Sequence, residues 1–285
     1  MENPESERRQ LINVAYRMLG SLADAEDVVQ ETYARWYAMT AAEQATIDVP
    51  GAWLTKVASR ICLDHLRSAR VRRERYVGEW IPEPVPEPDG SDPADRITLD
   101  ESVSMAFLVV LDAMTPAERV AFILHDVFRY SFAEVAEVAG RSPAACRQLA
   151  SSARRRIRDA ERPAAPSARR AELVREFKAA WEATDIAALV TLLDPEVTAV
   201  ADGGGIVNAA LEPVHGGADV AQYFARLPVF TLGRTLIERT VNGQPGLVIQ
   251  FEGVTETVIA FDVADDRITN IWAIRNPEKL NPWQS

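Results

Sequence analysis

The chain has 285 residues, of which 47% are hydrophobic, and its formal net charge is −11. The sequence contains no apolar run near eighteen residues, and residues 1–10 are polar with no hydrophobic region behind them. We therefore expect a cytosolic protein without a membrane span or a signal peptide. Cys62, Cys146 and the histidines have no ligand partner at short spacing, so no disulfide framework, metal site or cofactor is predicted.

The negative charge is unevenly distributed along the chain. Residues 76–100 and residues 163–285 each carry a net charge of −6, whereas residues 1–75 are neutral and residues 101–162 carry +1. Acidic segments repel nucleic acid, so the two balanced segments are the candidates for DNA contact. The length suggests about two domains, and the motifs described below indicate three.

Two amphipathic helices are predicted first, over Arg8–Leu19 and from Asp24 to about Met39. The second helix carries acidic residues on the outer side of its first two turns. Acidic residues favour a helix N-terminus through capping and the macrodipole, which explains Asp24 and Asp27 better than Glu31. A cationic protein partner is the other explanation, and its candidate contacts are Asp24, Glu26, Asp27 and Glu31.

A polar loop from Thr40 to Pro50 leads into a long helix, predicted from Ala52 to about Arg75. One side of this helix is apolar, whereas the other side carries enough basic residues for several phosphate contacts. A tryptophan near its start could stack on an unpaired base, although a core tryptophan is the commoner outcome. The candidate DNA-binding residues of this helix are Trp53, Lys56, Arg60, Arg67 and Arg70, with Arg72, Arg73 and Arg75 extending the basic surface.

Residues 76–100 contain five prolines and seven acidic residues, so this segment is predicted to be an extended linker. Residues 82–93 cannot form a helix because proline recurs through them.

Thr115–Asp159 is predicted to contain two helices, a glycine turn and a basic helix, which together form a helix-turn-helix. Ser131 and Glu134 have the spacing of a capping box, and Gly140 supplies the turn. Ser142-Pro143 then opens the basic helix with an N-cap and a proline at its first position.

The basic helix is expected to read duplex DNA. Residues 140–162 contain seven arginines and two acids, a local charge of +5 in an acidic chain. An ordinary helical hairpin with a solvated basic face is the alternative, but the caps, the turn and the one-sided arginines agree on DNA binding. The residues expected to pack inward are Ala145, Leu149, Ala153 and Ile157. The residues expected to reach bases are Ala144, Arg147, Gln148 and Ser151, and those expected to reach the backbone are Arg141, Arg154, Arg155 and Arg156.

The segment after Pro163–Ser167 changes its pattern. Helices are predicted over Ala168–Thr184, over Ile186–Leu193 and from Ala218 to about Leu227. Strands are predicted over Glu196–Ala201, Gly205–Leu211, Arg234–Asn242, Leu247–Glu252, Thr255–Val263 and Arg267–Ile274. Helices followed by an antiparallel meander predict an α+β cone with an internal pocket.

Residues 22–37 (LADAEDVVQETYARWY) and 50–75 (PGAWLTKVASRICLDHLRSARVRRER) resemble region two of extracytoplasmic-function sigma factors, and the helix-turn-helix resembles their region four. The resemblance covers residues from about 7 to 160. It implies that the acidic helix docks on the clamp helices of RNA polymerase core. It also implies that the basic helix and its preceding loop melt and capture the minus-ten promoter element, while the helix-turn-helix reads the minus-thirty-five element. Catalysis would belong to the polymerase.

Residues 215–227 (HGGADVAQYFARL) resemble the SnoaL-like polyketide-cyclase superfamily. Sigma factors that carry such a C-terminal domain have short signatures, which three segments of this chain resemble: Trp80–Pro84, Asp202–Gly205 and Asn276–Leu280. After the glycine turn, Ile206 stands where those sigma factors usually have lysine. The resemblance implies interdomain regulatory contacts by Trp80, Pro82, Glu83, Pro84, Asp202, Gly203, Gly204, Gly205, Asn276, Pro277, Lys279 and Leu280.

Some SnoaL-like proteins are enzymes that use a buried Asp/His pair. Asp202 and His215 are the candidates in this chain, but their spacing does not fix a pair. The three glycines after Asp202 are typical of a turn between strands. No catalytic residue is therefore predicted, and the chain is not expected to be an enzyme.

These observations predict a multidomain protein: region two over residues 1–76, an acidic proline-rich linker over 77–100, region four over 101–162 and a SnoaL-like domain over 163–285. The predicted protein is an alternative sigma factor whose C-terminal domain modulates activity in cis. RNA polymerase core and promoter DNA are the expected partners, a small ligand in the C-terminal pocket stays open, and a monomer is expected. The alternatives are a ligand-sensing helix-turn-helix regulator without polymerase contact and an enzyme tethered to DNA.

Overall fold

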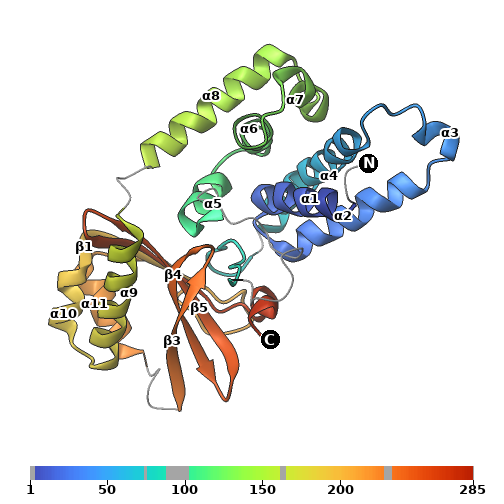
Figure 1. Ribbon diagram of the computed structural model, residues 1–285. Helices are drawn as coiled ribbons and strands as arrows, with labels where there is room; N and C mark the ends of the chain where they lie inside the picture. The colour runs from blue at the N-terminus through green and yellow to red at the C-terminus, as the bar shows by residue number, and fades with distance from the viewer. Residues whose placement is uncertain (1–3, 74–75, 88–102, 161–164, 228–232, 285) are drawn as a thin grey trace. The chain divides into compact units, whose positions relative to one another are not determined.

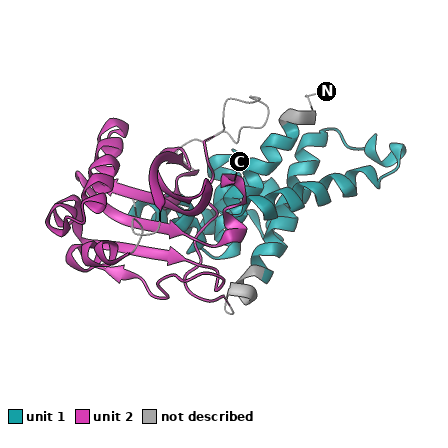
Figure 2. Cartoon of the chain, turned by 90° about the horizontal axis from the view of Figure 1, so that it is seen from below, with its two compact units in different colours: residues 1–74, 88–102, 107–161 teal, residues 75–87, 103–106, 162–285 magenta. Residues whose placement is uncertain are grey.

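The computed structural model describes residues 4–73, 76–87, 103–160, 165–227 and 233–284 (Figure 1). These residues form two compact units, which Figure 2 shows in different colours. The helical unit contains residues 4–73 and 107–160, and the sheet unit contains residues 76–87, 103–106, 165–227 and 233–284. Within these ranges, no helix is both long enough and apolar enough to cross a membrane.

The first part of the helical unit consists of α1 (Pro4–Leu19), α2 (Leu22–Tyr37), the short α3 (Ala41–Gln44) and α4 (Pro50–Arg73). The three long helices are confirmed, with starts two to four residues earlier than the apolar periodicity predicts. Helix α2 starts early because the Ser21 hydroxyl accepts a hydrogen bond from the Asp24 backbone N–H at 3.2 Å. Helix α3 lies in the segment predicted as a loop, where Thr40 and Glu43 form a capping box.

The second part of the helical unit contains the helix-turn-helix. Its elements follow α5 (Met105–Asp112) and are α6 (Pro116–Phe122), the π-helical turn η2 (Ile123–Val127), α7 (Phe132–Ala139) and α8 (Pro143–Ala160). Ser131 and Glu134 form the predicted capping box at the start of α7. Gly140 ends α7 with a left-handed φ of 64°, a conformation that glycine adopts more readily than residues with a Cβ. The predicted order of helix, turn and basic helix is confirmed.

Ala153 of α8 is buried as predicted, whereas the buried positions before it are shifted by one residue from the prediction. Cys146, Ala150 and Ala153 are fully buried, whereas Ala145, Leu149 and Ile157 are half-buried at the margins. The cause is that α8 packs on α6 as well as on α7, so its buried stripe faces both helices.

The sheet unit combines three helices with a six-stranded sheet. The helices are α9 (Ser167–Glu182), α10 (Ile186–Leu192) and α11 (Gly217–Arg226), and they lie together on one side of the sheet (Figure 1). The strands are β1 (Leu193–Asp202), β2 (Val214–His215), β3 (Arg234–Val241), β4 (Gln244–Phe251), β5 (Val254–Ala264) and β6 (Arg267–Ile274), in the spatial order β2-β1-β6-β5-β4-β3. The predicted α+β domain is confirmed.

Two details of the sheet differ from the prediction. Strands β1 and β6 are parallel, so the sheet is mixed and is not a simple antiparallel meander. Residues 205–211 do not form a strand, because Gly204 and Gly205 adopt positive φ and the Ile206 and Val207 N–H groups bond back to the Gly203 carbonyl. The two-residue strand β2 is too short to give a period.

The core of the sheet unit lies between the helices and the sheet. Four aromatic rings meet there, with neighbouring centroids 4.8 to 6.0 Å apart: Phe177 and Trp181 of α9, Phe224 of α11 and Phe261 of β5. The Trp181 indole N–H donates to the Phe224 carbonyl at 2.8 Å, which satisfies its polar atom inside the core. This core fixes β1 and β6, whose C-terminal ends carry the contacts described below.

Candidate nucleic-acid interface and linker clamp

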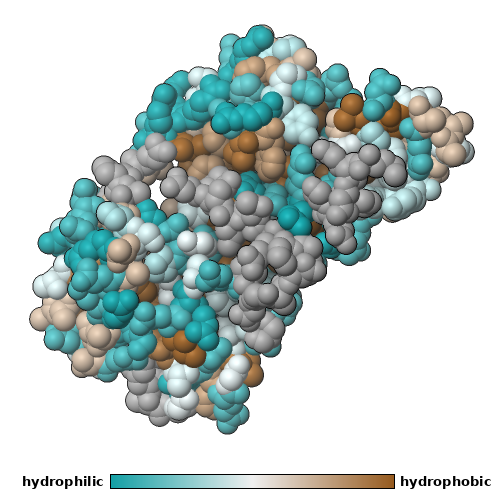
Figure 3. Space-filling view, in the orientation of Figure 1, coloured by the Kyte–Doolittle hydropathy of each residue, from teal (hydrophilic) through white to brown (hydrophobic). Residues whose placement is uncertain are grey.

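The outer side of α8 presents most of the residues predicted to bind the minus-thirty-five element. Their side chains are exposed at Arg141, Ala144, Arg147, Gln148, Ser151 and Arg155. The Arg147 guanidinium lies over the Phe132 ring at 5.5 Å, which holds it near the start of the helix. Figure 3 shows hydrophilic residues along the part of the helical unit that α8 occupies. Such a surface suits the major groove.

Two of the predicted backbone contacts, Arg154 and Arg156, lie beside acidic side chains of the protein although each is partly open to solvent. The Arg154 guanidinium pairs with Asp126 at 2.6 Å and is half-buried. Arg156 lies 3.8 Å from Glu118, whose side chain is 8% exposed. These two arginines therefore also join α8 to the preceding helices.

The acidic residues of α2 lie on its solvent side. Glu26, Asp27 and Glu31 are exposed, and Asp24 is half-buried beside the helix cap. Glu31 pairs with Arg35 one turn later at 2.5 Å. The remaining exposed carboxylates are oriented away from the core formed by Ala25, Val28 and Val29.

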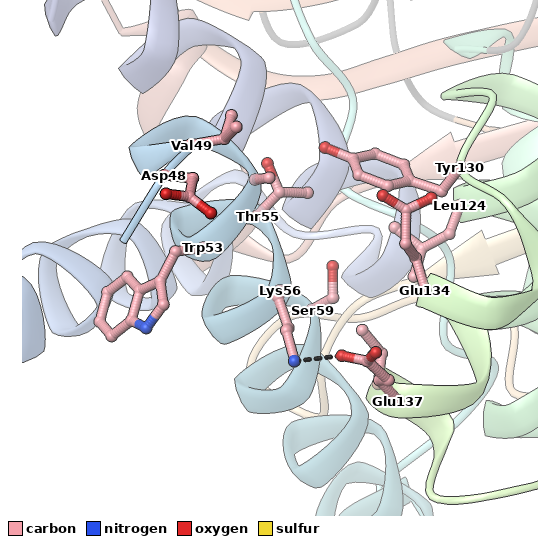
Figure 4. A pocket seen from close by; sticks show the side chains of 12 residues that line it. Asp48, Val49, Trp53, Thr55, Lys56, Ser59, Leu124, Tyr130, Glu134 and Glu137 are labelled. Atoms are coloured by element: carbon pink, nitrogen blue, oxygen red, sulfur yellow. Dashed lines mark hydrogen bonds and ion pairs between the residues drawn. The ribbon is translucent and has the colours of Figure 1, made fainter. Parts of the chain in front are cut away.

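The basic side of α4 contacts the helix-turn-helix within the helical unit. The Lys56 ammonium pairs with the Glu137 carboxylate of α7 (Figure 4). The Arg60 guanidinium donates to the Glu137 carbonyl at 2.8 Å. The hydrogen bond from Lys56 lowers the pKa of Glu137. Glu137 thus binds two of the basic side chains predicted to contact DNA, those of Lys56 and Arg60. Sequence reasoning missed Glu137, because it is one of several exposed acids on short helices.

The other minus-ten candidates have different surroundings. Trp53 is half-buried, and its ring contacts the Trp36 ring of α2 with the ring centroids 5.2 Å apart. Arg67 is exposed and lies 3.3 Å from Asp64. The side chains of Arg70, Arg72 and Arg73, and Arg75 as a whole, lie outside the described residues.

The sheet unit holds the linker segment 76–86 through a group that we call the linker clamp: Asp202, Asn242, Asn276, Lys279 and Trp283. Asp202 is the last residue of β1 and is completely buried. Its carboxylate accepts hydrogen bonds from the Tyr76 hydroxyl at 2.7 Å, from the Ile81 backbone N–H at 2.9 Å and from the Lys279 ammonium at 2.6 Å. Burial and the Asp202 carboxylate raise the pKa of Tyr76.

Lys279 completes the ion pair from the other side of the linker. Its ammonium donates to the Ile81 carbonyl at 2.5 Å and lies 4.1 Å from the Trp80 ring centre. Its side chain is 10% exposed and that of Asp202 is 0% exposed, so the pair is shielded from water. A buried charge of this kind requires its partner, because an unpaired charge in the interior is strongly unfavourable.

The far end of the linker segment is held by its backbone. The Trp283 indole N–H donates to the Pro84 carbonyl at 2.8 Å. The Asn242 side-chain oxygen accepts from the Val85 N–H at 3.0 Å, and the Asn242 N–H donates to the Val85 carbonyl at 2.9 Å. Residues 81–85 are all buried as a result. The linker residues therefore belong to the fold of the sheet unit over this stretch.

The glycine turn after β1 allows the linker to approach closely. Gly204 has a φ of 64°, and a Cβ there would lie 2.5 Å from the Asn276 amide nitrogen. Gly205 has a φ of 70°, and its Cβ would lie 2.9 Å from the Val77 Cβ. Asn276 in turn donates to the Tyr76 hydroxyl at 2.9 Å. A side chain at either glycine would meet these neighbours and a strained backbone.

Of the predicted regulatory residues, Asp202, Gly204, Gly205, Asn276 and Lys279 meet linker residues or one another. Glu83 and Leu280 are buried, with 4% and 1% exposure, and Pro277 begins a short 3-10 turn after Asn276. Sequence reasoning missed Tyr76, Asn242 and Trp283. A tryptophan in a polar segment is unusual, so Trp283 could have been recognised as a candidate. The sequence does not indicate that its partner is the Pro84 carbonyl.

Asp202 and His215 do not form a catalytic pair. His215 is exposed and lies opposite Thr198, with the Thr198 hydroxyl 3.1 Å from its Nδ1. Asp202 lies four residues further along β1, which is about 13 Å in an extended strand. Each side chain has other partners. Among the described residues, no cluster of three or more metal-ligating side chains occurs.

The fold and the exposed surfaces define a class of protein. A helix-turn-helix with an exposed basic helix, a second basic helix with a nearby aromatic residue and a separate acidic helix define a DNA-binding transcription factor. Matches to family models narrow this class. Residues 5–72 match Sigma-70 region 2, and residues 104–157 match Sigma-70 region 4.

Relatives cover almost the whole chain. The ECF RNA polymerase sigma factor SigJ of Mycobacterium tuberculosis is 40% identical over 97% of this chain and 91% of its own length. The probable ECF RNA polymerase sigma factor SigI of the same organism is 34% identical over 96% and 92%. The crystal structure of M. tuberculosis SigJ matches with a TM-score of 0.79 and 37% identity, covering 98% of this chain and 97% of that one. The chain belongs to the extracytoplasmic-function (ECF) RNA polymerase sigma factors. It binds RNA polymerase core and directs transcription initiation, and the polymerase performs the chemistry.

Proposed function

We propose that three surfaces of the helical unit divide the work of promoter use. The acidic side of α2 docks on polymerase core through Asp24, Glu26, Asp27 and Glu31. The basic side of α4 takes the minus-ten element, and the exposed side of α8 takes the minus-thirty-five element. The exposure of Glu26, Asp27 and Glu31 on α2, of Arg60 and Arg67 on α4 and of Arg147 and Arg155 on α8, together with the sign of their charges, supports the assignment.

The compact helical unit must open for this work. Arg119 of α6 is 3% exposed and donates to the Met18 carbonyl of α1 at 2.8 Å, so the two parts of the unit share a buried contact. Two promoter elements about 25 base pairs apart are separated by about 85 Å of duplex at 3.4 Å per base pair. Helices in direct contact cannot reach both elements. The compact form is therefore the resting form, with Glu137 on α4 in place of DNA.

The sheet unit modulates this opening in cis, because it holds the segment that follows α4. The observation that carries this proposal is the completely buried Asp202, which binds Tyr76, Ile81 and Lys279 at once. Residues 81–85 cannot extend toward DNA while they are buried in the clamp. Docking of the linker thus sets how far the two DNA-binding parts can separate.

In vitro transcription in which this chain is the only sigma factor tests the modulation. Lys279→Met keeps the length of the side chain and removes the charge, so the linker is released. Lys178→Met is the matched control, since Lys178 forms a surface pair with Glu182 on α9. We expect Lys279→Met to change promoter-dependent transcript yield at least threefold, while the control stays at the wild-type level. Equal yields from all three proteins would refute modulation by the clamp.

A second function, the sensing of a small ligand, is favoured by a cavity of about 500 Å³ within the sheet unit. This volume falls in the range of small-molecule pockets. We infer that a ligand in this cavity regulates the activity of the protein. We also infer that the protein acts in the cytoplasm as a monomer. Analytical ultracentrifugation tests the monomer, and a dimer at micromolar concentration would contradict it.

A further inference from the structure

The cavity of the sheet unit is lined by apolar residues and by a few charged and polar residues. Trp181, Phe224, Ile249 and Ile259 form part of its apolar lining. These residues come from α9, α11, β4 and β5, so the cavity lies on the side of the sheet that the helices cover. An apolar body of a ligand would be desolvated there.

The charged lining residues of the cavity are Arg234, Glu256 and Arg275, which leave a net charge of +1. Arg234 and Glu256 pair with each other at 2.5 Å. Arg275 donates to the Asn208 carbonyl, and no carboxylate pairs with it among the described residues. A guanidinium without an acidic partner in the lining of a largely apolar cavity favours an anion.

A hydroxyl donor lies near this guanidinium. Tyr223 lines the same cavity and is half-buried. Burial raises the pKa of Tyr223, while the charge of Arg275 opposes the shift in part. The tyrosine therefore stays protonated and can donate a hydrogen bond to an oxyanion beside Arg275.

We propose that this cavity binds a small organic carboxylate with an apolar body, and that its occupation strengthens the hold of the linker clamp on residues 76–86. The proposal rests on the cis modulation described above and names the chemical class of its input. The carboxylate meets Arg275 and Tyr223, and the apolar body fills the space beside Trp181.

Two pairs of neighbouring residues connect the cavity to the clamp. Ala201 lines the cavity, and the next residue, Asp202, binds the linker through Tyr76. Likewise, Arg275 lines the cavity, and the next residue, Asn276, donates to the Tyr76 hydroxyl. Successive residues of an extended strand face opposite sides, so the two sites share the ends of β1 and β6. The backbone N–H groups of Arg275 and Asn276 both donate to the Asp202 carbonyl, at 2.7 and 2.9 Å. These bonds tie the two strand ends together.

The coupling is positive. A ligand that orders Arg275 and the adjoining strand ends lowers the entropic cost of docking the linker on the same strand ends. By linkage, a released linker must weaken ligand binding by the same factor.

Calorimetric titration of the full-length protein with 1-naphthoate and with neutral 1-naphthamide tests the ligand class. We expect the carboxylate to bind about tenfold more tightly than the amide, because a charge-assisted hydrogen bond is lost in the amide. Arg275→Gln should reduce the preference to less than about twofold, whereas Arg239→Gln, an exposed arginine of β3, should keep it. Thermal unfolding verifies that both variants fold. Absence of binding, or equal binding of the two probes, would overturn the proposal.

Hydrogen exchange of the linker amides tests the coupling and separates the two proposals. The Ile81 and Val85 N–H groups should be protected in the free protein, and saturating 1-naphthoate should slow their exchange at least threefold. Unprotected linker amides in the free protein would refute the clamp itself. Protected amides with unchanged exchange at saturation would leave the clamp intact and refute the coupling.

Discussion

The substitution Asp202→Asn is the sharpest perturbation of the linker clamp. Asparagine has nearly the same shape, so packing at the end of β1 stays the same. Its NH₂ group, however, replaces one oxygen that accepts from Ile81 and Lys279, at 2.9 and 2.6 Å. The NH₂ group then faces the Ile81 N–H and the Lys279 ammonium, which are also donors. The Lys279 charge loses its carboxylate partner while its side chain is only 10% exposed.

The cost of this change follows from the burial of the pair. Removal of one partner of a buried ion pair destabilises by about 3–5 kcal/mol. Release of the linker lets Lys279 reach water, so the free energy of docking decreases by about 3 kcal/mol, the lower end of that range. This corresponds to roughly a 100-fold decrease in the ratio of docked to released linker.

Hydrogen exchange with mass spectrometry measures that ratio directly. In a peptide that covers residues 80–86, the prolines carry no amide hydrogen, so the signal comes from few residues. The Ile81 and Val85 amides should lose about two decades of protection in Asp202→Asn. Asp266→Asn is the control, because Asp266 is exposed and pairs with Arg169 at the surface. It should change stability by less than about 0.5 kcal/mol.

One result would refute this reasoning. If protection of the Ile81 amide in Asp202→Asn stays within twofold of the wild-type protein, the ion pair does not hold the linker. Protection lost equally in the Asp266→Asn control would point to a general loss of stability in the sheet unit.

Three further predictions concern the helical unit. Glu137→Lys places like charge beside Lys56, so the free protein should bind a single-stranded minus-ten oligonucleotide at least threefold more tightly in fluorescence anisotropy. The exposed control Glu182→Lys should not, and equal affinities would show that Glu137 does not mask α4. Arg147→Ala should cost about 1–3 kcal/mol of discrimination at one promoter position in a gel-shift competition, and a uniform loss across all sequences would assign Arg147 to the backbone instead. Burial opposes ionisation of Glu118, but hydrogen bonds from Ser152 and Thr115 outweigh it and lower its pKa below 4.5. The stability from this group is therefore present above about pH 4.5 and is lost as the pH falls through the lowered value, so urea unfolding of Glu118→Gln should show a flatter acid limb than wild type.

The local elements could be predicted because their signals are local. Ser131, Glu134 and Gly140 define both ends of α7 within ten residues, and the structure shows the expected capping box and left-handed turn. The shifted buried positions of α8 could not be predicted, since they depend on α6, whose last residue, Phe122, lies 21 residues before the first residue of α8, Pro143. Strand pairing at long range decides that β1 and β6 are parallel.

The linker clamp shows the same limit. The segment around Trp80 and the Asp202 turn were recognisable as candidate regulatory residues, but not as partners. Asp202 and Lys279 are 77 residues apart, and Tyr76 lies 126 residues before Asp202. Nothing in the spacing indicates that one carboxylate binds all of them. The contacts arise only once the ends of β1 and β6 are brought side by side.

The central claim is that this chain is a sigma factor that binds polymerase core through the acidic side of α2. Size-exclusion chromatography of the purified protein with bacterial RNA polymerase core tests it directly. The wild-type protein should co-elute with core, and the double variant Asp27→Arg/Glu31→Arg should not. The matched control is Glu172→Arg/Glu176→Arg, which reverses two exposed acids at the same spacing on α9 and should co-elute like wild type. Co-elution of the α2 variant at the wild-type level would contradict the assignment of this surface. Absence of co-elution by the wild-type protein would contradict its action as a sigma factor.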